Sequence, residues 1–503
     1  MSFGPPPSIY TESHRAAEGR RSRRRLRWFG VAGALALLAG AGIGTWLLAS
    51  PGSSGDTPAD DRPAAVAQQP DEIRETVEKP PASPEGRLML YQQETGLEEF
   101  KNGGDRYAPG TWATGEIFAK GTADKILGYD IAPDSEDPAW TLDLDGHLCA
   151  TSEHVTADGR TAVVVQPPKP DGADTEGVCD QVVFFDIDTG KKLWQSTMPS
   201  AGSAFVTNTN LTLTRGVVAI AWGQGSVAYD MKDGRKLWDG TSVSSCEDRG
   251  FAGGRALLAL LTCGTGANAT YRVQRLDPRT GEPEWTYEVA RGVQDVYLPS
   301  SEPPVLAVAA GDTSVTELIT LDDDGTYLAT VPMSGRHDPK CGDRYFSSPF
   351  FGVVEHCDAL VVDDDRLYVA TKEEPTPAQP ANWIVAFDTA TGKTTGKFEG
   401  RPYQPVYPLR TSGDELLIIR ESLSEVEPTA VVAWNPETDK ETPYLLFGLP
   451  EEEMGQLADL EWSDIVVEQG RLFLSRRQIE PDAEDPEAPV LASIAIGSFG
   501  LEH

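Results

Sequence analysis

The 503-residue chain has few of the residues and motifs from which active sites are commonly built. It contains six histidines and six cysteines, and no two cysteines are adjacent. It also has no Gly-x-Ser-x-Gly elbow, no zinc-protease His-Glu motif and no phosphate-binding loop. We therefore predict no catalytic residue, no cofactor and no bound metal. Because carboxylates are abundant, a hydrolase or lyase built on a carboxylate pair stays open.

Basic residues are scarce as well. The chain has 43 lysines and arginines against 78 aspartates and glutamates, which gives a net charge of -35 at pH 7. A surface of this sign repels phosphate backbones and anionic lipid headgroups, so nucleic-acid binding by the folded part is excluded. Hydrophobic residues make up 39% of the chain, which is enough to build a large core.

Long apolar runs are absent with one exception. Residues from Trp28 to Ala49 carry no charge and are numerous enough, as a helix, to cross about 30 Å of hydrocarbon. Arginines crowd residues 15–27, and such positive flanks stay cytoplasmic. We expect a single-pass membrane helix over 28–49, a cytoplasmic tail over 1–27 and an extracellular remainder. A cleaved signal peptide is the alternative, although Leu47 stands where its cleavage site needs a small residue.

The segment after this run is rich in proline. Residues 50–86 combine seven prolines with glycine, serine, alanine and acidic residues, a composition that does not build a core. We read it as a disordered linker between the membrane and a folded domain over 87–503. No cysteine precedes Cys149, which excludes a bacterial lipid anchor before the linker.

The remaining chain repeats one unit. A strand-like run ends in Asp, a Gly-containing turn follows, and a Trp comes next, as in Ala228-Tyr-Asp-Met-Lys-Asp-Gly-Arg-Lys-Leu-Trp238. Further full copies end at Trp194 and Trp285, and the units recur about every 50 residues. This period, with strand-like composition, favours a β-propeller. The Asp caps backbone N–H groups and the Gly accepts a positive φ, so we predict a hairpin turn here. A calcium-binding loop is the alternative.

A second hairpin precedes each copy, so each unit supplies four antiparallel strands, A to D, which form one blade. We count eight blades, with seven as the alternative. The last blade lacks a fourth strand. The run from Leu88 to Gln92 could supply this strand and so close the ring without an exposed sheet edge. The fold class is therefore all-β.

The repeated pattern Ala-x-Asp-x-x-x-Gly-Lys-x-x-Trp resembles the tryptophan-docking motif of the pyrroloquinoline-quinone (PQQ)-like propellers. This fold is shared by quinoprotein alcohol dehydrogenases and the outer-membrane assembly lipoprotein BamB. The resemblance implies that Trp194, Trp238 and Trp285 pack between neighbouring blades. Gly396 or Phe398 and the stretch after Asn435 depart from the pattern, which implies looser docking of blades six and seven. The dehydrogenases of this family carry adjacent cysteines at the quinone, and this chain has no such pair.

The long connections fall mainly on one face of the expected disc. Residues 166–181, 372–382, 421–429 and 478–489 join strands B and C, and 333–358 joins strand D to the next strand A. Insertions confined to one face usually mark a binding surface. Solvated acidic loops, and aromatic residues packed as a small core beneath a loop, are the alternatives. The candidate partner residues are Tyr345, Phe346, Phe350, Phe351, Glu480, Asp482, Glu484, Asp485 and Glu487.

All six cysteines follow the apolar run, as disulfides in an oxidising compartment would require. We predict nearest-neighbour pairing, because each pair then joins connections on the long-loop face. The alternative is a zinc site built from His337, Cys341, His356 and Cys357. The predicted pairs are Cys149 with Cys179, Cys246 with Cys263, and Cys341 with Cys357.

These features favour a membrane-tethered, non-catalytic binding or scaffold module. Its expected partner is a protein, peptide or glycan of the cell envelope that binds the long-loop face. The alternatives are a PQQ-dependent dehydrogenase, or another propeller enzyme, and the ligand-sensing part of a signalling complex. The sensor is disfavoured because residues 1–27 are too short for a kinase. The pattern does not indicate an oligomeric state.

Overall fold

The structure is a computed structural model, and it describes part of the chain. The predicted cytoplasmic tail, membrane helix and first part of the linker lie outside that part. Within it, no helix is long and apolar enough to span a membrane. The described residues are 68–78, 80–94, 106–132, 137–168, 177–241, 246–264, 269–311, 314–333, 335–342, 354–372, 381–422, 428–448, 457, 460, 462–479, 485 and 488–498.

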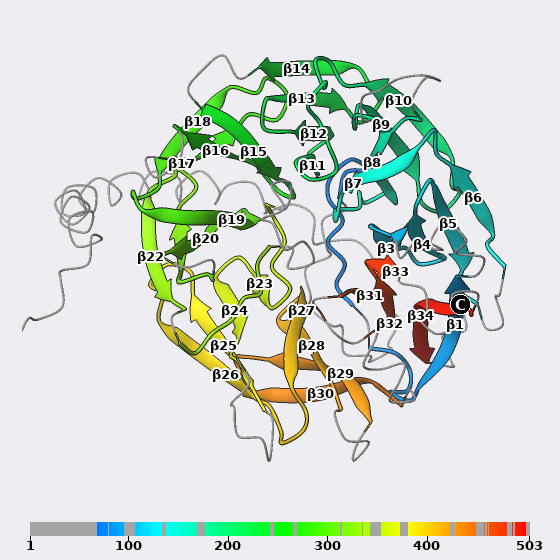
Figure 1. Cartoon of the computed structure of the whole chain (residues 1–503). Helices are drawn as coiled ribbons and strands as arrows, with labels where there is room; N and C mark the ends of the chain where they lie inside the picture. The colour runs from blue at the N-terminus through cyan, green and yellow to red at the C-terminus, as the bar shows by residue number, and fades with distance from the viewer. Residues whose placement is uncertain are drawn as a thin grey trace, which may run out of the picture. The chain divides into compact units, whose positions relative to one another are not determined.

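Four-stranded antiparallel sheets follow one another around a ring (Figure 1). The first blade consists of β3 (Thr111–Ala113), β4 (Ile117–Thr122), β5 (Lys125–Asp130) and β6 (Trp140–Asp143). The second consists of β7 (His147–Thr151), β8 (Arg160–Gln166), β9 (Gln181–Asp186) and β10 (Lys192–Thr197). The third consists of β11 (Asn210–Thr214), β12 (Val217–Ala221), β13 (Gly225–Asp230) and β14 (Lys236–Thr241). The fourth consists of β15 (Cys246–Ala252), β16 (Leu257–Cys263), β17 (Thr270–Leu276) and β18 (Pro283–Glu288).

The next three blades repeat this order. The fifth consists of β19 (Val293–Ser301), β20 (Pro304–Ala310), β21 (Glu317–Leu321) and β22 (Tyr327–Pro332). The sixth consists of β23 (Leu360–Val362), β24 (Arg366–Ala370), β25 (Trp383–Asp388) and β26 (Thr394–Glu399). The seventh consists of β27 (Val406–Ser412), β28 (Glu415–Arg420), β29 (Thr429–Asn435) and β30 (Lys440–Phe447).

The eighth blade joins the two ends of the folded region. It consists of β31 (Ser463–Glu468), β32 (Arg471–Arg476), β34 (Val490–Ser498) and β1 (Gly86–Glu94). In the ladder between β1 and β34, Leu88 lies opposite Ile496 and Tyr91 opposite Ile494. A two-stranded ribbon of β2 (Arg106–Tyr107) and β33 (Gln478–Ile479) lies beside this blade. The predicted eight-bladed propeller and its closure by residues 88–92 are confirmed, and the seven-bladed alternative is wrong.

The core lies between neighbouring blades. Each inner strand is apolar on both faces because each face meets another sheet, and β12 is buried along its whole length. Between the second and third blades, Val164 and Phe184 pack with Leu213 and Ile220. The outermost strands are less buried, and β10 is partly buried or exposed along its whole length. The stacking of blades therefore buries the apolar residues that no single sheet covers.

The two faces of the propeller differ in their connections. On one face, which we call the turn face, short turns join strands A to B and C to D. In the turn after β9, the Asp186 Oδ1 atom accepts hydrogen bonds from the Thr189 N–H and hydroxyl, and Gly190 has a φ of 65°. The opposite face, which we call the loop face, carries the B–C and D–A connections, including those after β8, β22, β24, β28 and β32.

Three tryptophans of the repeat bind to the turn of the following blade. The Nε1 atom of Trp194 donates a hydrogen bond to the Met231 carbonyl at 2.8 Å. In the same way, Trp238 donates to the Pro278 carbonyl and Trp285 to the Asp323 carbonyl, both at 2.9 Å. Each indole thus covers the Asp-to-Gly turn of its neighbour.

Two further tryptophans complete this system. Trp140 of the first blade lies against Gly190 in the turn of the second, although the sequence repeat did not reveal it. Trp434 of the seventh blade is 1% exposed and lies over Gly396 of the sixth, with its ring centroid 5.6 Å from that of Phe398. Looser docking was expected at this junction, but Trp434 fills the space that the missing side chain of Gly396 leaves.

Residues 68–78 and 80–86 contact the propeller. The first of these segments runs in blue through the middle of the ring in Figure 1. Ile73 forms a β-bridge with Thr156 of the second blade, and Glu85 forms one with Leu446 of the seventh. For these residues the prediction of a disordered linker is wrong. Composition shows that they cannot build a core of their own, but they gain their hydrogen bonds from the blades.

Candidate functional site

A cavity of about 420 Å³ lies among the innermost strands, at the centre of the ring. Its walls come from several blades because the first strand of every sheet faces the axis. The lining includes Thr111 of β3, Thr151 of β7, Leu211 of β11, Leu409 of β27 and Asp464 of β31.

The cavity is part of the central channel that the innermost strands surround. The chain fills part of this channel with its own residues. Val354 accepts a hydrogen bond from the Leu298 N–H at 2.8 Å. The Glu355 Oε1 atom accepts from the Gly253 N–H at 2.6 Å and from the Thr212 hydroxyl at 3.1 Å, and it lies 3.0 Å from His154 Nε2. Residues 354–358, which we call the plug, thus reach the second, third, fourth and fifth blades. They belong to the connection over residues 333–358, which the sequence predicts for the loop face.

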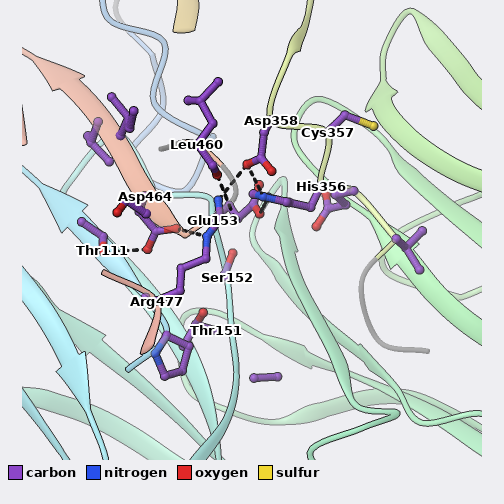
Figure 2. Close-up of a pocket in the computed structure, with 18 of the residues that line it drawn as sticks. Thr111, Thr151, Ser152, Glu153, His356, Cys357, Asp358, Leu460, Asp464 and Arg477 are labelled. Carbon is purple, nitrogen blue, oxygen red and sulfur yellow. Dashed lines mark hydrogen bonds and ion pairs between the residues drawn. The ribbon is translucent and has the colours of Figure 1, made fainter. Parts of the chain in front are cut away.

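Arg477, just after β32, links the plug to the eighth blade. Its Nη2 atom is 2.8 Å from Asp358 Oδ1 and its Nε atom is 2.7 Å from Asp464 Oδ1, and Figure 2 shows the guanidinium between the two carboxylates. Asp464 also accepts a hydrogen bond from the Thr111 hydroxyl at 2.7 Å and lies 3.9 Å from the Lys120 Nζ atom. The network therefore joins the first and eighth blades to the plug.

His356 continues the network to the second blade. Its Nδ1 atom lies 2.6 Å from Glu153 Oε1 and its Nε2 atom 2.6 Å from Asp358 Oδ1 (Figure 2). Burial disfavours the imidazolium, but the carboxylates of Asp358 and Glu153 outweigh this effect and raise the pKa of His356 to about 10. His356 is therefore a cation at neutral pH, held between two carboxylates.

The other charged groups respond to the same two influences. Burial opposes ionisation of Asp358, but His356 and Arg477 together lower its pKa to about 2. Burial lowers the pKa of Lys120 to about 8, and nearby Asp464 only partly offsets it. For Asp464, Arg477 and Lys120 outweigh burial and hold the pKa below its usual range.

This arrangement can hold charge and position chain segments. Arg477 and His356 each lie between two carboxylates that come from different parts of the chain, so the charges of these groups compensate one another. Among the described residues, no group of three or more His, Cys, Asp or Glu side chains is arranged to hold a metal ion. The chemistry that the channel supports directly is electrostatic fastening of the plug to the blades.

The three predicted disulfides are confirmed. Cys149 pairs with Cys179, Cys246 with Cys263, and Cys341 with Cys357. Cys246 and Cys263 are also opposite each other in the ladder between β15 and β16. Because the sulfurs of Cys341 and Cys357 are bonded to each other, the alternative zinc site with His337 and His356 is wrong.

The predicted partner surface lies almost entirely outside the described residues. This applies to the aromatic residues Tyr345, Phe346, Phe350 and Phe351 and to the acidic residues Glu480, Asp482, Glu484 and Glu487. Asp485 is the one described member, and it is exposed. The proposed use of this surface stays a prediction.

Sequence reasoning missed most of the channel network. The sequence indicated His356 only as an alternative zinc ligand. It did not indicate Asp358, Asp464 or Arg477, because the chain contains so many charged residues. The available signal was position: Asp464 comes directly before the apolar residues Ile465 to Val467 of an inner strand, where a charged side chain needs a partner.

The repeats, the eight four-stranded blades and the tryptophan contacts together define the class of protein. The chain is an eight-bladed β-propeller, and its repeat resembles that of the PQQ-like propellers. Within it, residues 84–250 match the family model described as outer membrane protein assembly factor BamB. Among curated proteins, no sequence matches the chain.

Solved structures of similar architecture include BamB from Moraxella catarrhalis, with 13% identity over 78% of this chain and 96% of that one, at a TM-score of 0.41. A europium-containing methanol dehydrogenase has 11% identity over 82% of this chain and 93% of that one, also at 0.41. Quinohemoprotein alcohol dehydrogenase ADHIIG from Pseudomonas putida HK5 has 12% identity over 78% of this chain and 75% of that one, at 0.43. Similarities of this size do not carry an activity from one protein to another.

Proposed function

We propose that this propeller is a non-catalytic scaffold of the cell envelope that binds a protein, peptide or glycan partner through its loop face. The proposal includes the single-pass anchor over residues 28–49, with a cytoplasmic N-terminus and an extracellular propeller. One observation carries it. The long connections after β8, β22, β24, β28 and β32 gather on the loop face, whereas the turn face has short turns such as that between β11 and β12.

Two further features support a binding role. The match of residues 84–250 to the BamB family model favours a propeller that assembles with other proteins. In addition, the charged groups of the channel already pair with one another and with the plug. A partner would therefore meet the surface of the propeller, and the acidic loop residues favour one that is basic or neutral.

The dehydrogenase alternative makes a different demand on the cysteines. Quinoprotein dehydrogenases, by family resemblance, place two adjacent cysteines at the quinone. Here the bonded cysteines are 30, 17 and 16 residues apart, and each pair ties together neighbouring loop-face segments. This pairing favours a role in holding connections in place.

The test compares two sets of charge-neutralising substitutions in the full chain. The first replaces Glu480, Asp482 and Glu484, which the sequence predicts to lie in a loop-face connection, with the corresponding amides. The matched control replaces Asp323, Asp324 and Asp365, which are exposed carboxylates of the turn face. Partners captured from envelope extracts with the wild-type chain are then purified and titrated against each variant.

We expect the loop-face variant to bind a captured partner at least tenfold more weakly, and the control variant to bind it as the wild type does. Equal binding by both variants would place the contact elsewhere. A parallel titration with PQQ and calcium, followed by a dye-linked alcohol oxidation assay, tests the enzyme. Saturable quinone uptake with turnover would overturn the proposed scaffold role.

A further inference from the structure

Residues 70–78 lie across the turn face, with a turn at residues 70–72 and no turn from Ile73 to Glu78, and the blades bind their backbone. The Arg74 N–H donates to the Val155 carbonyl and the Ala157 N–H to the Glu72 carbonyl, both at 2.8 Å. The Gly216 N–H donates to the Asp71 carbonyl at 3.0 Å. Main-chain pairing of this kind is how proteins commonly bind an extended peptide.

At the other end of the segment, the carboxylate of Glu78 contacts residues of the seventh and eighth blades. Its Oε2 atom accepts hydrogen bonds from the Tyr444 hydroxyl at 2.9 Å and the Gly470 N–H at 3.0 Å. Its Oε1 atom lies 3.4 Å from the Arg410 Nη1 atom, and the residue is only 7% exposed. The Glu78 N–H donates to the Ser412 hydroxyl at 2.7 Å. Three partners therefore bind the carboxylate, and Ser412 binds the backbone of the same residue.

A second carboxylate contact lies three residues earlier. Glu75 meets Arg255 of the fourth blade through two bonds, Nε to Oε1 at 2.5 Å and Nη2 to Oε2 at 3.0 Å. Bidentate pairs of this kind fix the position of the carboxylate as well as its charge. Arg410 adds a hydrogen bond to the Thr76 carbonyl between the two sites.

The binding of this segment depends on polar recognition rather than apolar burial. Val77 is 67% exposed, and Ile73 is the main apolar contact with the blades. The whole chain has a net charge of -35, which disfavours approach of a further acidic segment. The groove nevertheless presents Arg255, Arg410 and a buried Tyr444 hydroxyl to the carboxylates of the segment. Its own carboxylate, Glu468, lies 3.7 Å from Arg74 and 3.4 Å from Arg410.

We propose that this groove is a peptide-binding site on the turn face. Its ligand class is an extended peptide with two carboxylate side chains three residues apart, and residues 70–78 are its resident ligand. When the resident segment is released, a partner segment with the same pattern takes its place. This site is separate from the loop face and does not depend on the function proposed above.

The test uses a synthetic, fluorescently labelled peptide with the sequence of residues 66–79. It is titrated by fluorescence anisotropy against the full chain in detergent, in which residues 80–83 have been replaced by a protease site. Cleavage breaks the covalent link between the resident segment and β1. Washing then removes the released segment from the groove. We expect saturable binding to the cut, washed protein and binding at least tenfold weaker to the uncut protein, where the groove is occupied.

Two peptide variants make the test specific. Glu78→Gln removes the buried charge, so we expect binding at least tenfold weaker. Glu72→Gln is the matched control, because the Glu72 side chain bonds only to the Gln69 N–H of the segment itself among the contacts that the structure describes, and we expect unchanged binding. Equal affinity of the two variants, or no saturable binding, would overturn the proposal.

A second measurement covers the case in which the cut protein unfolds. The full, uncut chain with Glu78→Gln holds its own segment more weakly, so the wild-type peptide should compete for the groove and bind measurably. The uncut wild-type chain should bind it at least tenfold more weakly. If the uncut Glu78→Gln chain, with an unchanged near-ultraviolet circular dichroism spectrum, also fails to bind the peptide, the groove is not a site for exchangeable ligands.

Discussion

Arg477 is the residue on which the channel network depends most, because it neutralises two carboxylates at once. Replacing it in Arg477→Met leaves Asp358 and Asp464 without the partner that lies 2.8 and 2.7 Å away. Breaking a buried pair in this way leaves uncompensated charge, so we expect the free energy of unfolding to fall by about 3–5 kcal/mol. Urea denaturation followed by tryptophan fluorescence measures the change.

The control for this substitution is an exposed ion pair. Lys236 lies 2.9 Å from Asp239, and both side chains are at least 40% exposed. Lys236→Met should therefore change the free energy of unfolding by less than about 1 kcal/mol. A loss as small as this for Arg477→Met would show that the channel network does not hold the plug.

The titration of the network predicts how stability depends on pH. The pKa of His356 is about 10 in the folded protein, above its unfolded value of about 6.5, so its contribution is complete below pH 6.5 and is lost as the pH rises toward 10. The pKa of Asp358 is about 2, below its unfolded value of about 3.9, so its contribution is lost as the pH falls from 4 toward 2.

We therefore expect this network to contribute most between about pH 4 and 6.5. Thermal melting from pH 3 to 10 should show that the wild type loses its advantage over His356→Gln above pH 6.5. His147→Gln, at an exposed position of β7, should follow the wild-type curve throughout. Parallel curves for wild type and His356→Gln would contradict the assignment of His356 as a partly buried cation.

Sequence could predict some of these residues and not others. The disulfides followed from the even number of cysteines and their order along the chain. The charged network did not, because its members come from residues 153, 356–358, 464 and 477, which only closure of the ring brings together. Ion pairs between segments so far apart in the sequence do not follow the repeat. In the sequence they therefore look like the many charged residues that face solvent.

At the scale of elements, the contact between each tryptophan and the next turn requires glycine for two separate reasons. Gly190 has a φ of 65°, and a Cβ there would lie 2.4 Å from the Trp140 ring. Gly292 has a φ of 87° but nothing within 4 Å of its Cβ position. A comparison of substitutions at these two glycines therefore distinguishes the cost of backbone strain from the cost of steric overlap with an indole.

We expect Gly292→Ala to lower the free energy of unfolding by about 1–2 kcal/mol, the cost of the left-handed backbone alone. Gly190→Ala should cost about 1–3 kcal/mol more, because the added methyl group displaces the indole between two blades. Urea denaturation of both variants gives the difference. Equal losses would mean that the Trp140 contact adds nothing to blade docking.

The repeat predicted the tryptophans that keep its spacing and missed one that does not. Trp194 follows Asp186 by eight residues, whereas Trp140 follows Asp130 by ten, because the connection between β5 and β6 is longer. Trp434 escaped for another reason. It precedes the turn of its own blade, and only the three-dimensional packing shows that it fills the space over Gly396.

At the scale of the whole molecule, the number of blades and the closure of the ring were predictable. The first follows from the number of repeats, and the second from the rule that sheet edges are covered. Eight repeats gave eight blades, and the incomplete last blade required a strand from elsewhere. The path of residues 68–86 was not predictable, because its proline-rich composition is the same whether the segment is free or bound to a surface. Its contacts are hydrogen bonds and ion pairs whose partners lie in distant blades.

Ring closure by β1 gives the last prediction. Shortening the chain to residues 80–503 removes most of the segment bound to the turn face but keeps β1, so we expect a monomer with a lower melting temperature than residues 68–503. Shortening it to 96–503 also removes β1 and exposes the edge of β34, from Val490 to Ser498. An unpaired apolar edge promotes pairing with other chains, so this protein should aggregate.

Size-exclusion chromatography with light scattering distinguishes the three shortened proteins. Adding a peptide of residues 84–95 should restore the monomer, because it supplies the missing strand to β34. A 96–503 protein that is monomeric and melts with 80–503 would show that the eighth blade does not need β1.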